Sequence, residues 1–261
     1  MNGNEVFGYP QYDANGMRVI TRTTGAYSHA MMNITSYWMK AGDTRSFCFP
    51  DEEMAVLLVS GSVEIAWEGK KETASRKSWH EEDLSCLHVC KDTAVLVKAL
   101  SDSEVLVQTT ENDRAFDSKF YRIEDCMVNM SGVGLCGETN IRRVVTVFDY
   151  HTAPYSNMVL GEVMSNQGNW SAYIPHHHPQ PEVYYYHFDH PQGFGACFIG
   201  DDVFKIKDGS FSAIPGGKTH PQVTAPGYKM YTCWMIRHFD GNPWTDRIDD
   251  EAHTWLYDAK F

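Results

Sequence analysis

A histidine-rich segment in the second half of the chain carries the residues best suited to chemistry. In PHHHPQPE, at 175–182, three imidazoles and a carboxylate stand directly before a run of aromatic and β-branched residues. These side chains suit Zn, Mn, Fe, Co or Ni as ligands. Because residues two apart on an extended chain point to the same side, His176 and His178 can face one ion, and His177 should point away. Glu182 opens the following strand and can supply an oxygen.

A second motif follows further along the chain. GSFSAIPGGKTH, at 209–220, reads as a strand that ends in a Gly-rich turn and presents one more histidine, His220. Together the two segments resemble the cupin pattern of HxH, a following Glu, and then G-(x)5-PxG-xx-H, in that order. In cupins both motifs lie on neighbouring strands of a small barrel. The resemblance therefore implies one divalent metal ion held by His176, His178, Glu182 and His220, with coordination positions open for a substrate.

Short runs rich in Val, Ile, Tyr and Phe predict the strands that must position these ligands. Gly, Asp, Asn and Pro separate the runs at the spacing of an antiparallel sandwich or barrel, and long amphipathic helical patterns are absent. In the first half the predicted strands are 55–59, 63–67, 94–100 and 105–109, with a hairpin at Ser60-Gly61. In the second half they are 142–148, 158–164, 183–188, 196–200, 211–215 and 229–236.

The chain is therefore predicted to be all-β, with two tandem cupin barrels, each a double-stranded β-helix. The stretch 126–140 contains Gly and Asn and has no clear period, so it is the expected boundary. Residues 1–130 would form a degenerate, cupin-like β domain without a metal motif, and residues 131–261 the metal-binding cupin. The first domain would support the second or an oligomer interface.

Composition excludes several other classes of protein. A formal net charge of −12 disfavours nucleic acid and anionic membranes as partners. The N-terminal segment has no signal-peptide pattern and no stretch approaches the ~20 apolar residues of a membrane span, so we expect a cytoplasmic protein. The seven cysteines form no CxxC pair and suit free thiols, and Cys86-x-His88-x-Cys90 has no nearby fourth ligand, which favours a structural role. The GxGxxG, P-loop and GxSxG motifs are absent.

Three segments around the metal motif narrow the resemblance to one family. GNWSAYIPH at 168–176, PQGFG at 191–195 and APGY at 225–228 resemble the corresponding segments of the 5-deoxyglucuronate isomerases, a bicupin family that also contains 5-keto-4-deoxyuronate isomerases. The likeness covers most of residues 140–261. The loop from His178 to Glu182 is shorter than in the inositol-pathway isomerases, His187 stands where they tend to carry Arg, and Lys218-Thr219 alters the turn before His220. These departures concern the substrate, not the metal.

The resemblance implies aldose–ketose isomerisation of a sugar acid: 5-deoxy-glucuronate to 5-deoxy-2-keto-gluconate in inositol catabolism, or a related uronate. A divalent ion, Zn or Mn first and Fe, Co or Ni as alternatives, would bind the carbonyl and adjacent hydroxyl oxygens and stabilise the enediolate. No organic cofactor is then required. The base that moves the proton between neighbouring carbons is Glu182, Tyr184, Tyr186 or His187, which the sequence does not rank.

The carboxylate of such a substrate needs a cation. Arg237 is the first candidate because a guanidinium binds a carboxylate through two hydrogen bonds, and Lys218 is the second. Gln192 and Tyr228 lie in the shared segments and are expected to bind sugar hydroxyls, although turn formation explains those segments nearly as well.

Two other functions share the same ligand set. A cupin dioxygenase would use Fe(II) and take up oxygen, and a non-catalytic sugar-binding or regulatory cupin would bind its ligand without turnover. The expected partner is a small-molecule sugar acid, with no nucleic acid and no membrane. We also expect the chain to form a homo-oligomer.

Overall fold

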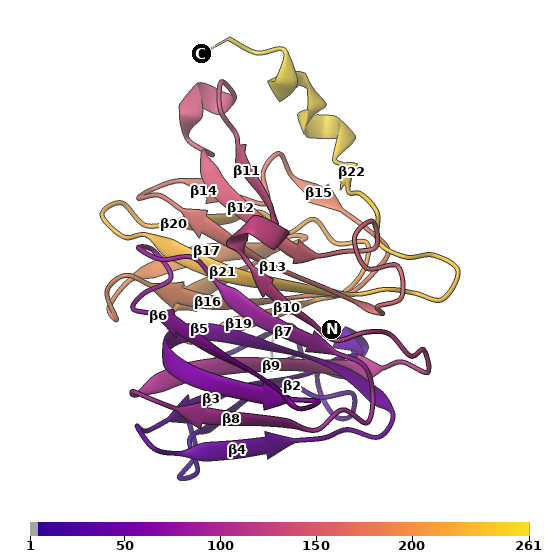
Figure 1. The fold of residues 1–261 in the computed structure, drawn as a ribbon. Coiled ribbons are helices and arrows are strands. Elements are labelled where there is room, and N and C mark those ends of the chain that lie inside the picture. The colour runs from indigo at the N-terminus through magenta and orange to yellow at the C-terminus, as the bar shows by residue number, and fades with distance from the viewer. Residues whose placement is uncertain (1–4, 261) are drawn as a thin grey trace.

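The computed structural model describes residues 5–260, which form two β-barrels stacked on one another (Figure 1). Residues 1–4 and residue 261, which the sequence prediction assigned to the outer ends of the two domains, lie outside the described residues. The purple strands of the N-terminal half and the pink-to-yellow strands of the C-terminal half occupy separate layers (Figure 1). No helix within residues 5–260 is both long and apolar enough to cross a membrane. The predicted all-β, two-barrel architecture is confirmed.

The N-terminal barrel is a single nine-stranded sheet that curls on itself. Its main path runs β10-β7-β5-β9-β3-β2, and β4, β6 and β8 form the second wall. Apolar side chains such as Met54, Ile65 and Val97 fill its interior, which is why it can serve as a support. Its strands are β2 (Met17–Thr21), β3 (Asn33–Met39), β4 (Thr44–Phe47), β5 (Glu52–Trp67), β6 (Lys70–Arg76), β7 (Ser85–Val89), β8 (Val95–Ala99), β9 (Ser103–Glu111) and β10 (Lys119–Arg122).

The hairpin predicted at Ser60-Gly61 is wrong, because β5 continues unbroken through these residues. The first part of β5 pairs with β7 and β9, and the part from Gly61 onward pairs with β6 and β8. Gly61 has φ +101°, and a Cβ there would lie 2.2 Å from Ser103 Oγ. The glycine therefore marks a bend at a barrel corner, which a sequence pattern does not distinguish from a turn.

The C-terminal barrel has two facing sheets. A seven-stranded sheet in the order β1-β19-β16-β21-β13-β12-β11 forms one wall, the four-stranded sheet β14-β20-β17-β18 forms the other, and β15 pairs with β22. All six strands predicted for this half are present. The strands are β1 (Phe7–Gly8), β11 (Met127–Ser131), β12 (Arg142–Phe148), β13 (Met158–Ser165), β14 (Trp170–Ser171), β15 (His176–His177), β16 (Glu182–Phe188), β17 (Phe194–Ile199), β18 (Asp202–Lys207), β19 (Phe211–Ile214), β20 (Gln222–Thr224), β21 (Met230–Arg237) and β22 (Ile248–Asp249). Short 3-10 helices are η2 (Ser28–Ala30), η3 (Ile123–Asp125), η4 (Cys136–Glu138) and η5 (Glu251–Tyr257).

Two short strands place the boundary between the two barrels differently from the sequence prediction. The stretch 126–140, expected to be irregular, contains β11, which pairs with β12, and β1 pairs with β19. Both strands therefore belong to the C-terminal sheet, although β1 and all of β11 except Ser131 fall within residues 1–130. Most β11 side chains are exposed, so the alternation of apolar and polar residues that reveals a half-buried strand is missing. We propose that the division falls between β10 and β11.

The two barrels share an apolar core between their large sheets. Leu57 from the N-terminal sheet and Val147, Tyr185 and Met235 from the C-terminal sheet all belong to it. Because side chains alternate along a strand, β16 directs Tyr185 into this shared core and Tyr184 into the C-terminal barrel. This alternation decides which residues can reach a site inside the barrel.

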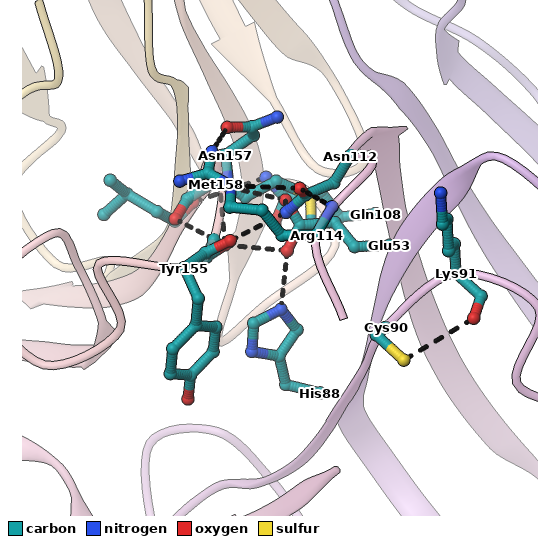
Figure 2. A network of polar contacts seen from close by, with 12 residues as sticks. Glu53, His88, Cys90, Lys91, Gln108, Asn112, Arg114, Tyr155, Asn157 and Met158 are labelled. Carbon is teal, nitrogen blue, oxygen red and sulfur yellow. Dashed lines mark hydrogen bonds and ion pairs between the residues drawn. The ribbon is translucent and has the colours of Figure 1, made fainter. Parts of the chain in front are cut away.

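A buried polar network also joins the halves, with Glu53 at its centre (Figure 2). The Glu53 carboxylate accepts hydrogen bonds from Asn112 Nδ2 (3.1 Å), Ser156 Oγ (2.8 Å) and the backbone N–H of Asn157 (2.6 Å), and lies 2.9 Å from His88 Nε2. His88 also stacks on an aromatic ring of the C-terminal half. The predicted structural role of the Cys86–Cys90 segment agrees with this placement, because Cys90 Sγ turns away to the Lys91 carbonyl (Figure 2).

A buried ion pair crosses the same interface. Arg76 of β6 and Glu162 of β13 are both fully buried, and Arg76 Nη1 and Nη2 donate to Glu162 Oε1 and Oε2 over 2.6 and 2.9 Å. Tyr231 OH donates to Glu162 Oε1 (2.7 Å). The paired geometry satisfies both charges, which is the condition for an ion pair to be tolerated away from water.

Candidate metal centre

Four side chains from the two sequence motifs meet inside the C-terminal barrel. One ligand atom from each of His178, Glu182 and His220 lies within 4.8 Å of the others, and all three residues are buried. The ring of His176 stands beside them, with its centroid 5.0 Å from that of His220. His177, between the two inward histidines, is more exposed, as the alternation of an extended chain predicts.

The glycine-rich turn brings the two motifs together. Gly217 N–H donates to the His178 carbonyl over 2.7 Å, and a Cβ at Gly216 would lie 1.7 Å from the Pro179 carbonyl oxygen. Any larger residue at Gly216 would push the two loops apart. The turn can therefore carry His220 against the loop that carries His178 only because it lacks side chains there.

Each histidine is fixed in orientation by its own backbone. Nδ1 lies 2.9 Å from a carbonyl oxygen two residues away in all three: His176 with Ile174, His178 with Gln180, and His220 with Lys218. A ring that donates through Nδ1 carries its free electron pair on Nε2. Such hydrogen bonds to the outer nitrogen are typical of metal-binding histidines.

The protonation states also suit a cation. Burial opposes the charge of Glu182, but His178 and His220, each with Nε2 3.1 Å from Glu182 Oε2, outweigh burial and lower the carboxyl pKa to about 2. Burial and the neighbouring His220 lower the pKa of His176 to about 3. At neutral pH these two residues are an ionised carboxylate and a neutral imidazole, the forms that bind metals.

One buried atom tests whether a metal fits this cluster. His220 Nε2 faces the Glu182 carboxylate without the alignment of a hydrogen bond, so it is a buried nitrogen without a hydrogen-bond partner. Buried polar atoms are rarely left in that state. A cation that accepts the electron pairs of three imidazoles and one carboxylate would satisfy this atom, so the residues fit a divalent ion.

The cluster opens into a cavity of about 430 Å³. Its volume is within the ~300–1,000 Å³ range of small-molecule sites. His176, His178 and Glu182 line one part of it, and Tyr184 lies beside them. Burial and the charge of Glu182 raise the pKa of Tyr184, so its phenol is protonated at neutral pH.

The other two residues proposed as bases lie away from this cavity. Tyr186 is packed among apolar side chains in the barrel and is hydrogen-bonded to Ser212 Oγ (2.8 Å). His187 is on the opposite face of β16, where Nε2 lies 3.2 Å from Glu104 and Nδ1 lies 2.9 Å from Asp208. The assignment of His187 as a base is therefore corrected: it faces the N-terminal half because it is an odd number of residues from Glu182.

The His187 contacts predict a pH-dependent stability. Burial lowers the pKa of His187, but Glu104 and Asp208 outweigh it and raise the pKa to about 10, compared with about 6.5 in an unfolded chain. This stabilisation is complete below about pH 6.5 and is lost as the pH rises through 10. Between pH 8 and 10 the unfolding free energy of the wild type should fall by up to about 1.4 kcal/mol per pH unit more than that of His187→Gln. Urea denaturation of both proteins measures this, and equal slopes would contradict it.

The four residues predicted to bind substrate also lie outside the cavity. Gln192 and Lys218 are exposed, and Tyr228 packs against His190 and Phe194. Arg237 is buried at the interface between the barrels, where Nε donates to Thr110 Oγ1 over 2.9 Å. The structure therefore supports no contact between these side chains and a molecule in the cavity.

Residues other than the four predicted substrate-binding residues line the cavity. Arg142 of β12, together with Asp246 and Arg247 of the segment before β22, lines the cavity. Arg142 begins the predicted strand 142–148 and lies on the same face of the strand as Val144 and Thr146, which also line the cavity. The alternation of side chains along a strand therefore gives a signal for the direction of Arg142. Asp246 and Arg247 lie in a segment without a periodic pattern, so the sequence offered no signal for them.

The fold and the site together define a bicupin whose C-terminal barrel holds a cluster of candidate metal ligands. A family model described as the KduI/IolB family matches residues 9–256. The chain belongs to this family.

Curated relatives span almost the whole chain. A protein of Geobacillus thermodenitrificans named 5-deoxy-glucuronate isomerase is 24% identical, with 96% of this chain and 94% of that protein covered. A Bacillus subtilis (strain 168) protein of the same name is 22% identical, with 93% and 94% covered.

Solved structures share the fold. An IolB-like protein from Salmonella typhimurium superposes with a TM-score of 0.86 at 17% identity, covering 97% of this chain and 99% of that one. An oxalate decarboxylase from Lactobacillus farciminis superposes with a TM-score of 0.68 at 12% identity, covering 98% and 90%. The predicted cupin fold is confirmed.

Proposed function

We propose that the chain is a metal-dependent aldose–ketose isomerase of a sugar acid, with 5-deoxy-glucuronate as its substrate and, as its product, the ketose in which the carbonyl has moved from C1 to C2. The chain is an isomerase of the KduI/IolB family, and its curated relatives carry the name of that reaction. The observation that carries the metal dependence is the buried cluster of His176, His178, Glu182 and His220 at the cavity wall. Zn and Mn are the first candidates for the ion. Homo-oligomeric assembly and a cytoplasmic location stay predictions from the sequence.

The reaction moves two hydrogens and leaves the oxidation state of the molecule unchanged. One hydrogen passes from C2 to C1 as a proton, and the hydroxyl proton passes from O2 to O1. A divalent ion bound at the cluster would supply Lewis acidity toward the carbonyl and the neighbouring hydroxyl. The chain itself must hold the substrate and provide groups that accept and return the protons.

Two side chains in the cavity can move these protons. The carboxylate of Glu182 is ionised at neutral pH and can accept a proton from carbon and return it to the neighbouring carbon. The phenol of Tyr184 stays protonated and can donate a hydrogen bond or a proton to the developing oxygen charge. Trp234 and Trp244 line the same cavity and reduce the access of water.

Proton NMR in D2O tests the proposal directly. The metal-loaded protein is incubated with 5-deoxy-glucuronate and, in parallel, with a panel of uronates. Loss of the aldehyde or hemiacetal C1 signal, with growth of a ketose signal that carries deuterium at C1, is the expected result. Oxygen uptake is recorded in the same samples.

The outcomes separate the competing functions. Silence across the panel, from protein that demonstrably holds one metal ion per chain, would contradict a sugar-acid isomerase. Oxygen consumption with bound iron would instead support the dioxygenase, and binding of a sugar acid without turnover would support the non-catalytic cupin.

A further inference from the structure

Arg142 is a buried cation that points into the cavity. Its side chain is 4% exposed, and it lines the cavity together with Val144 and Thr146 from the same face of β12. Nη1 donates to the Asn140 carbonyl (2.7 Å) and Nη2 to the Tyr173 carbonyl (2.9 Å). A guanidinium has five N–H donors, so these bonds fix its plane and leave donors free for another partner.

Among the residues that the structure describes, no carboxylate pairs with the charge of Arg142. Within residues 5–260 its hydrogen-bond partners are the two carbonyl groups, whereas the fully buried Arg76 is paired with Glu162. Burial and the positive charge of Arg247 lower the pKa of Arg142 to about 10, so it is still charged at neutral pH. A buried charge without a counter-ion is costly, and an anion in the cavity would remove that cost.

The second arginine of the cavity is less available. Arg247 Nε lies 3.0 Å from Asp249 Oδ1, and Nη2 donates to Tyr257 OH over 3.0 Å. Its charge is therefore shared with a carboxylate. Arg247 adds positive potential at the cavity wall, while Arg142 offers the free donors.

We propose that Arg142 binds the carboxylate of the substrate and is the residue that selects sugar acids over neutral sugars. The inference rests on the proposed function for the identity of the substrate. The proposal also sets the orientation of the substrate in the cavity. The carboxylate end of the substrate lies against β12, and its C1–C2 end lies against the histidine cluster. A neutral sugar leaves the buried guanidinium unpaired and is therefore bound poorly.

The test compares two substrates in matched variants. Arg142→Gln removes the charge but keeps an amide that can donate to a carbonyl, and Arg142→Lys keeps the charge without the paired donors. Arg143→Gln is the control, because Arg143 is the next residue of β12, points to the other side and pairs with Asp83 at the surface. The substrates are 5-deoxy-glucuronate and 5-deoxyglucose, in which a hydroxymethyl group replaces the carboxylate.

For Arg142→Gln, kcat/KM with the acid should fall about 10–100-fold, mainly through KM, while kcat/KM with the neutral sugar stays unchanged. Arg142→Lys should lose less, and Arg143→Gln should match the wild type with both substrates. An equal loss with both substrates would assign Arg142 a purely structural role and overturn the proposal. Unchanged kinetics with the acid would overturn it as well.

A binding measurement separates this inference from the isomerase proposal. Calorimetry with gluconate, a sugar acid that has no aldehyde to isomerise, is performed on the metal-loaded wild type, Arg142→Gln and Arg143→Gln. Gluconate binding that is weakened only by Arg142→Gln supports the carboxylate site even if no isomerisation is found. Gluconate binding that does not depend on Arg142 rejects the site even if the isomerase is active.

Discussion

Replacing His220 with alanine is expected to abolish metal binding and to lower isomerase activity by about 10³-fold or more. His220 comes from a different loop than the other three residues of the cluster, so its loss removes the ligand that closes the site from that side. Several kcal/mol of charge stabilisation by the ion would be lost, and about 4 kcal/mol corresponds to 10³-fold in rate. Metal content per chain by elemental analysis, together with turnover by NMR, measures both effects.

His177→Ala is the matched control for this variant. His177 lies between two members of the cluster but points away from it, so its removal should leave one ion per chain and normal turnover. If His220→Ala retains a full equivalent of metal at wild-type affinity, the cluster is not the binding site. Circular dichroism of both variants checks that the barrel is folded.

Breaking the buried ion pair between the barrels should have the largest effect on stability. Glu162→Met leaves the Arg76 guanidinium fully buried without its carboxylate and removes the acceptor of Tyr231. An unpaired buried charge of this kind costs about 3–5 kcal/mol. We expect the urea midpoint to fall accordingly, as followed by tryptophan fluorescence.

Two further variants show whether the loss comes from the orphaned charge. The double variant Arg76→Met/Glu162→Met removes both charges and should be more stable than Glu162→Met alone, because apolar replacements of a buried pair are often nearly neutral. Asp83→Asn breaks the exposed pair with Arg143 and should change stability by less than about 1 kcal/mol. A double variant that is less stable than the single variant would mean that the pair itself, rather than the lone arginine, dominates.

The cluster of candidate metal ligands was predictable because its signals are local. His176, His178 and Glu182 lie within residues 176–182, which span β15, a turn and the start of β16, and His220 follows its own glycine-rich turn, so short-range spacing fixes where each points. The alternation of side chains along β16 could also have excluded His187 from the candidate bases. Along β16, Glu182, Tyr184 and Tyr186 share one face, and His187 is on the other face with Tyr185.

The residues that line the cavity were harder to predict because they depend on how distant strands pair. Arg237 and Arg142 are both arginines at a strand end, and only the arrangement of the two sheets puts the first against the N-terminal half and the second in the cavity. Short strands pose the same difficulty. β1 and β11 each lack a clear pattern, and their partners are defined only in the finished sheet.

The pairing of β1 with β19 imposes an order on biosynthesis. Phe7 is added to the growing chain before its partner Ser212, which follows about 200 residues later. At roughly 5–20 residues per second, the first strand must wait about 10–40 s while the N-terminal barrel can already fold. The edge of β19 is closed only when that early segment docks, so expressing the C-terminal barrel alone would leave an open strand edge prone to intermolecular pairing.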